Sequence, residues 1–181
     1  MKLQRNLKET ITLKTAMDWI EKLDMVPHPE GGFYTRPHVS KEKYIRHDIP
    51  GISSSERKLW TSEYMLFEPN MIMTFHTLRS ESVWYYHCGA SLKFYLISPD
   101  GDLIIKHLGL DMDAEHTPQI QIPKNYAIAI DAGKDEYSLI GTMISPGFDM
   151  DDLKVFNRQD LLKRHPHHKD LIKAFTTESI Y

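Results

Sequence analysis

The chain has 181 residues, a formal charge of −3 and one cysteine, Cys88. This length is typical of one domain that buries its own core, so no disulfide framework or structural metal is required. The charges nearly balance and the basic residues form no long run, which argues against nucleic-acid binding. The sequence has neither an apolar run of membrane-spanning length nor the apolar segment of a secretory signal. We therefore expect a cytoplasmic protein that makes no membrane contact.

The first predicted element is a short amphipathic helix over residues 15–23. Thr15 and Asp18 have the spacing of a capping box. Apolar side chains fall on adjoining turns at Met17, Ile20 and Leu23. Residues 26–29 end the helix.

Short strand-like stretches then follow one another as far as residue 145, separated by turn residues. They are Gly32–Pro37, Leu59–Phe67, Ile72–Leu78, Ser82–Cys88, Leu92–Ser98, Leu103–Leu108, Gln119–Ile122, Tyr126–Ile130 and Ser138–Ile144. Asp100 and Gly101 predict a tight hairpin turn. Short strands without long helices between them indicate an all-β antiparallel sandwich or barrel. The polar segment Lys41–Lys58 lacks periodicity and is interpreted as a long loop.

The tail is predicted to be helical. Asn157 is a candidate N-cap, Pro166 ends the first helix, and a second helix carries Leu171, Ile172 and Phe175. The spacing within His165–His168 matches no common zinc site, so we interpret these histidines as solvated groups at a helix end. We expect one domain over residues 1–181, with a core of about residues 26–150 and a tail of about residues 151–181.

The segment His28–Arg36, HPEGGFYTR, holds an imidazole, a carboxylate, a phenol and a guanidinium around two glycines. Because side chains alternate between the faces of a strand, His28, Glu30 and Tyr34 are expected on one face and Phe33 on the other. Such a cluster can line a small-molecule pocket. The alternative is a salt-bridged edge strand.

The stretch from Phe75 to Gly89 has the layout of a β-hairpin and resembles the first motif of the cupin superfamily. In metal-binding cupins this motif and a second one supply histidines and a glutamate to one ion. Here the first histidine is His76, but the other ligand positions hold Leu78, Ser82 and Ile128. We therefore expect no metal and no other cofactor.

A shifted metal site could use His76, Glu81 and His87. If Ser82 faces inward, strand alternation places His87 on the outer face. Only a β-bulge would reverse this argument.

Several stretches resemble an uncharacterised cupin-5-like group within the superfamily. They are His28–Arg36 with Ser40, residues 118–123, residues 137–152, and residues 158–172. The resemblance implies a double-stranded β-helix, or jelly roll, and a homodimer. It also implies a pocket similar to that of metal-free sugar-nucleotide epimerases and isomerases, whose histidine base occupies the position of His76. The chain departs from the group at Ser82, Tyr85 and Asn125.

These observations predict a metal-independent isomerase or epimerase that acts on a small polar or sugar-like metabolite. His76 is the candidate base, and Tyr86 or Tyr34 the candidate acid.

The candidate ligand-binding residues are His28, Glu30, Arg36 and Trp84. The first alternative is a non-catalytic cupin that holds a ligand against its aromatic side chains. A metal-dependent dioxygenase is the second alternative, and it requires ligands that the motifs lack.

Overall fold

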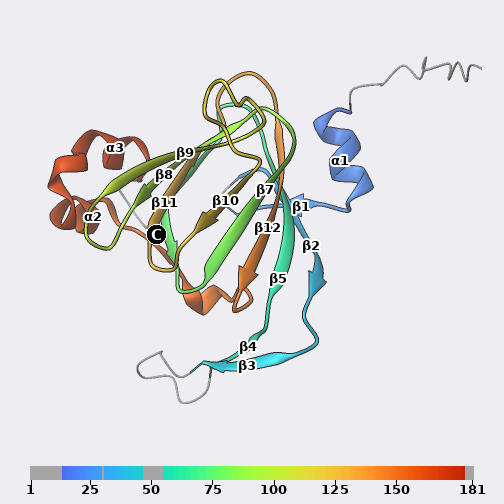
Figure 1. The fold of residues 1–181 in the computed structure, drawn as a ribbon, viewed down its shortest axis with the longest axis horizontal. Coiled ribbons are helices and arrows are strands. Elements are labelled where there is room, and N and C mark those ends of the chain that lie inside the picture. The colour runs from blue at the N-terminus through green and yellow to red at the C-terminus, as the bar shows by residue number, and fades with distance from the viewer. Residues whose placement is uncertain (1–13, 30, 47–54, 178–181) are drawn as a thin grey trace, which may run out of the picture.

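The computed structural model describes residues 14–29, 31–46 and 55–177. It contains two antiparallel sheets that face each other (Figure 1). The six-stranded sheet has the order β1 (Val26–Pro27), β2 (Phe33–Val39), β5 (Thr61–Phe67), β12 (Ser138–Ser145), β7 (Glu81–Gly89) and β10 (Gln119–Ile122). The five-stranded sheet has the order β13 (Leu153–Val155), β6 (Ile72–Leu78), β11 (Ala127–Asp131), β8 (Leu92–Ile97) and β9 (Leu103–Leu108).

Most successive strands alternate between these two sheets, for example β5, β6, β7 and β8. This winding is that of the double-stranded β-helix, so the all-β jelly-roll prediction is confirmed. Each predicted strand is present within a few residues of its expected bounds. The hairpin between β8 and β9 turns at Gly101, which has a φ of +98°.

The interpretation of residues 41–58 as a loop is wrong at both ends of the segment. β3 (Lys43–Arg46) and β4 (Ser55–Lys58) pair as a two-stranded arm that projects from the sandwich (Figure 1). Residues 47–54 lie outside the described part of the chain. The strands were missed because they are short, mostly polar and exposed, so they have no apolar alternation to detect.

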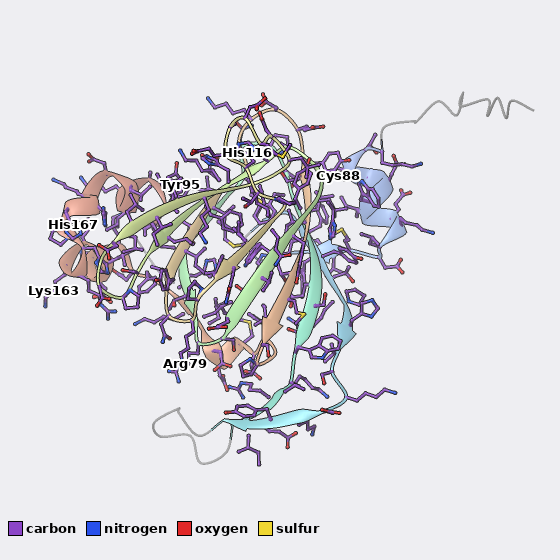
Figure 2. The ribbon with its side chains drawn as sticks, in the orientation of Figure 1. Arg79, Cys88, Tyr95, His116, Lys163 and His167 are labelled. Atoms are coloured by element: carbon purple, nitrogen blue, oxygen red, sulfur yellow. The ribbon has the colours of Figure 1, made fainter. Side chains whose placement is uncertain are left out.

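Apolar side chains form three layers. One core fills the space between the sheets, and its largest members include Phe67 and Phe94. A second core, which includes Phe75 and Phe175, covers the outer face of the five-stranded sheet under the C-terminal helices. A third lies on the outer face of the six-stranded sheet, beneath the N-terminal helix. Figure 2 shows Tyr95 and Cys88 on these two opposite outer sides.

The helices begin where the sequence predicts. α1 (Ala16–Lys22) has the complete capping box: the Asp18 amide donates to the Thr15 hydroxyl, and the Thr15 amide donates to the Asp18 carboxylate. The Asn157 side chain caps α2 (Arg158–Arg164), which is followed by η2 (Pro166–His168) and α3 (Lys169–Ala174). Among the described residues, no helix has the length and apolar character needed to cross a membrane.

Candidate functional site

A cavity of about 320 Å³ lies between the two sheets. Its size falls at the lower end of the range of small-molecule sites. The exposed Met150 lies at its rim, so the cavity reaches the surface there. Its lining consists of His28, Pro29, Tyr34, Arg36, Glu63, Met65, Met73, His76, Leu78, Trp84, Thr142, Ile144, Phe148, Met150, Leu153 and Val155.

One wall of the cavity is a row of side chains across three strands of the six-stranded sheet. Thr142 on β12 pairs with Glu63 on β5 and with Trp84 on β7. Paired residues of antiparallel strands point to the same face, so all three side chains face inward together. The Trp84 indole donates to the Ser82 hydroxyl at 3.0 Å. The Ser82 hydroxyl, at the position of the motif glutamate, is therefore occupied by a hydrogen bond from Trp84 of this wall.

The opposite wall carries His76 on β6. Its neighbours across the strands are Ile128 on β11 and Val155 on β13. The β6–β11 register shifts between the pairs His76–Ile128 and Met73–Ile130, which marks a bulge at residues 74 and 75. Because the bulge inserts a residue, Met73 and His76 both face inward while Phe75 packs on the outer core. The bulge thus aims His76 into the cavity.

The bulge also fixes the orientation and the tautomer of the His76 imidazole. Its Nδ1 lies 2.9 Å from the carbonyl oxygen of Thr74 within the bulge. A carbonyl only accepts, so Nδ1 must carry the proton in this contact. In the neutral ring, Nε2 is then the nitrogen with a free lone pair. His76 is buried, with 4% of its surface exposed.

The segment that begins at His28 forms the turn between β1 and β2 and reaches the cavity from its side. The His28 amide donates to the Gly32 carbonyl at 2.9 Å. A Cβ on Gly32 would lie 2.3 Å from the Leu66 carbonyl oxygen, so only glycine allows this close approach. His28 and Tyr34 meet edge to face, with ring centroids 5.3 Å apart. Both line the cavity, whereas Phe33 packs on the outer face.

Arg36 is held at the rim. Its Nε donates to Glu63 Oε1 at 2.6 Å, and its Nη2 lies 2.6 Å from the same oxygen. The guanidinium also lies over the ring of Phe148, 5.0 Å from the centroid. The charge of Arg36 is therefore neutralised by a protein carboxylate.

Two predicted site residues have no place in the described lining of the cavity. Tyr86 belongs to a deeper row with Ile140 and packs into the central core. Its hydroxyl donates to the Gly89 carbonyl, and burial raises the pKa of that phenol above its ordinary value. Glu30 lies outside the described residues.

Sequence reasoning missed two polar residues of the cavity, Glu63 and Thr142. Both lie within strands that the sequence predicts, at inward positions of the alternation. A glutamate in an inward row is unusual enough to have been a signal. The Thr142 hydroxyl is buried and has no hydrogen-bond partner among the described residues. Nothing in the sequence marks a threonine as unpartnered.

Two of the positions at which the cupin motifs place metal ligands lie next to His76, but their side chains do not fit an ion. Leu78 lines the cavity beside His76. Ile128 is the cross-strand neighbour of His76. The described chain contains no group of three side chains suited to hold a metal. His87 lies on the outer face, 5.4 Å from the ring of Tyr64, so it does not rebuild a site with His76. A bulge does occur in β7, but it follows Tyr86 and leaves Trp84 facing inward.

The two-stranded arm is tied to the cavity wall by a buried ion pair. Arg57 on β4 donates through Nε to the Asp152 carboxylate at 2.8 Å. Asp152 belongs to η1 (Met150–Asp152), which follows Phe148 and precedes Leu153 in the cavity wall. This hydrogen bond raises the pKa of Arg57 further above its ordinary value.

Comparison with protein families gives a match to the cupin superfamily family DUF985 (Cupin_5) over residues 17–156. No curated protein matches the chain.

Solved structures of similar fold include two matches over nearly the whole chain. A Shewanella oneidensis protein is 35% identical, with a TM-score of 0.79, and the match covers 92% of this chain and 100% of that one. A hypothetical protein from Leishmania major is 28% identical, with a TM-score of 0.81 and coverage of 91% and 100%. An oxalate decarboxylase shares the fold alone, at 12% identity, a TM-score of 0.52 and coverage of 85% and 37%.

Proposed function

The chain belongs to the cupin superfamily, in the family DUF985 (Cupin_5), and on this premise we propose that it binds a small molecule between its sheets and transfers a proton on it. The reaction type is a metal-independent isomerisation or epimerisation. One observation carries the proposal: the contact between His76 Nδ1 and the Thr74 carbonyl, which leaves Nε2 as the basic nitrogen. The fold alone does not decide among the many functions of cupins.

In the proposed reaction His76 Nε2 takes a proton from a carbon next to a carbonyl group. The electron pair of the broken C–H bond moves toward the carbonyl oxygen, and an enolate forms. Hydroxyl donors stabilise such an oxyanion, and Tyr34 and Thr142 are the hydroxyls of the cavity lining. The proton then returns to the other face or to a neighbouring carbon, so the step needs no oxidant or reductant.

The side chains at the ligand positions of the cupin motifs support this chemistry better than metal-assisted chemistry. Leu78, Ser82 and Ile128 stand where the cupin motifs place ligands, and none of them suits a divalent ion. A histidine base needs only placement and a partner for its second nitrogen, and Thr74 supplies that partner.

A non-catalytic ligand-binding cupin is the second candidate. It is favoured by the engagement of two polar groups that catalysis would otherwise use. Arg36 is paired with Glu63, and the Ser82 hydroxyl accepts from Trp84. In this case the cavity holds its ligand without changing it.

Deuterium exchange separates the two candidates. Purified protein is incubated in D₂O with cyclohexanone or with dihydroxyacetone, and proton NMR follows loss of the hydrogens next to the carbonyl. We expect exchange of one probe above the solvent rate and a decrease of at least about 100-fold in His76→Asn. Asparagine retains a donor near the Nδ1 position but has no basic nitrogen.

The control is His38→Asn, which changes an exposed histidine on β2 outside the cavity lining. Exchange that is equal in His76→Asn and wild type would contradict the role of His76. Failure of wild type to exchange either probe would contradict catalysis and favour the binding candidate.

The homodimer implied by the family resemblance is part of the proposal. It is supported by the apolar edge strand β9, where Leu103, Ile104 and Ile105 are exposed. Exposed apolar edge strands are common sites of association. Sedimentation equilibrium should give twice the chain mass, and a mass of one chain would contradict the dimer.

A further inference from the structure

The chemistry of the cavity lining identifies the class of molecule that fits it. Of the sixteen described residues that line the cavity, ten are apolar and six are polar or charged. The apolar set includes the aromatic rings of Trp84 and Phe148 and the flexible side chains of Met65, Met73 and Met150. Methionine side chains adapt to ligand shape, and aromatic rings favour flat apolar groups. This surface would leave most hydroxyls of a sugar without partners.

The charges of the lining also favour a ligand that is not a sugar nucleotide. Arg36 is the one lysine or arginine among the described lining residues, and Glu63 neutralises it. Phosphate groups are usually held by several cationic donors or by backbone amides at the N-terminus of a helix. The described helices contribute only Met150 of η1 to the lining, and η1 has three residues. A phosphorylated or nucleotide-linked substrate would therefore lack its usual partners.

The Thr142 hydroxyl indicates where the polar end of the ligand lies. It is buried, with 2% of the residue exposed, and it has no hydrogen-bond partner in the described protein. Buried hydroxyls nearly always bond to protein or to water, so one in a cavity wall that has no protein partner is available to bond to a ligand. It lies between Glu63 and Trp84 in the row that faces the His76 wall.

We infer that the ligand is an uncharged, mostly apolar ring compound with a hydroxyl or carbonyl group at one end, which bonds to the Thr142 hydroxyl. Phenols and cyclic ketones are of this class. The inference rests on the proposed use of this cavity as the ligand site, and it replaces the sugar-like metabolite expected from the family resemblance. The ring packs against Trp84 and the methionines. The polar end lies beside Thr142, in the row that Thr142 forms with Glu63 and Trp84.

The test is calorimetric titration with three probes: 4-methylphenol, toluene and UDP-glucose. Wild type should bind 4-methylphenol most tightly, toluene more weakly and UDP-glucose not at all. Thr142→Val removes the hydroxyl and keeps the shape, so it should weaken 4-methylphenol by about tenfold and leave toluene unchanged. Thr142→Ser retains the hydroxyl and should bind 4-methylphenol as wild type does.

The matched control is Thr77→Val. Thr77 also has a buried hydroxyl without a partner, but it lies outside the described cavity lining. Its replacement should leave the binding of each probe unchanged. Tighter binding of UDP-glucose than of 4-methylphenol would overturn the inference. So would unchanged 4-methylphenol binding in Thr142→Val.

Failure of this inference and failure of the proposed catalysis can be told apart, because the titration requires no turnover. Binding of 4-methylphenol through Thr142, with no deuterium exchange of either ketone probe, supports the ligand class and contradicts catalysis. Exchange of dihydroxyacetone that depends on His76, together with UDP-glucose binding, overturns the ligand class and supports catalysis.

Discussion

The Thr142 hydroxyl has a use in binding but no evident use in folding. It makes no hydrogen bond within the described protein, so it contributes little to the stability of the fold. Valine has nearly the same shape and no such group to satisfy. A threonine at this position is therefore better explained by a ligand than by packing.

We expect Thr142→Val to change the free energy of unfolding of the ligand-free protein by no more than about 0.5 kcal/mol, because no hydrogen bond within the described protein is lost. Urea denaturation measures the change, and Thr142→Ser serves as the variant that retains the hydroxyl. A larger decrease in the free energy of unfolding of Thr142→Val would show that the hydroxyl already has a partner.

At the scale of single residues, the sequence identified much of the cavity but not how it is assembled. His28, Tyr34, Arg36, His76 and Trp84 all line it. The inward direction of His76 depends on a bulge in β6, and a regular alternation of side chains cannot reveal an inserted residue. The ion pair between Arg36 and Glu63 depends on the register of β2 with β5, which is known only once the sheet has formed.

At the scale of elements, the arm β3–β4 and the segment η1 depend on each other. Arg57 and Asp152 are 95 residues apart in the chain, yet their side chains are 6% and 2% exposed and form one ion pair. A buried charge that loses its partner is strongly destabilising. The pair therefore fixes the position of Phe148 to Leu153 in the cavity wall.

Asp152→Asn should lower the free energy of unfolding by about 3 kcal/mol, because Arg57 stays buried with weaker partners. Asp151→Asn is the matched control: Asp151 is largely exposed and lies 4.0 Å from Arg57, so its change should remain within about 0.5 kcal/mol. Chemical denaturation of both variants provides the measurement. Equal stability of the two variants would show that burial adds nothing to this ion pair.

The strands that the sequence predicted are those with apolar alternation, because each buries one face in a core. β13 and the arm strands were missed since they are short and mostly exposed. Asn125 stands where the resemblance to the cupin-5-like group implies a glycine, and its φ is +66°. Asparagine enters this left-handed conformation more readily than most residues.

At the scale of the whole molecule, several partly buried histidines couple folding to pH. His165 packs between the C-terminal helices and the β8–β9 turn, while His167 and His168 bond to the Gly101 carbonyl. Burial, and then the neighbouring His167 and His168, lower the pKa of His165. Burial is also the main cause that lowers the pKa of His107.

A lowered pKa means that the folded protein binds fewer protons than the unfolded chain once the pH falls to the ordinary histidine value, about 6.5. The free energy of unfolding should therefore decrease between about pH 7.5 and pH 5.5. Urea denaturation across this range tests the sign, and His165→Asn should make the dependence shallower. A free energy of unfolding that rises on acidification would contradict the lowered histidine pKa values.

The proposed function depends on His76 presenting an unprotonated Nε2 to the ligand cavity. A long-range ¹H–¹⁵N NMR spectrum of histidine-labelled protein, recorded at about pH 8, above the ordinary histidine pKa of about 6.5, shows which ring nitrogen carries the proton. His76→Asn assigns the signal, and 4-methylphenol is then added. We expect a proton on Nδ1, none on Nε2, and a shift of the Nε2 signal upon addition of 4-methylphenol, while the signal of His38 stays fixed. A proton on Nε2, or a His76 signal that ignores the probe, would contradict it.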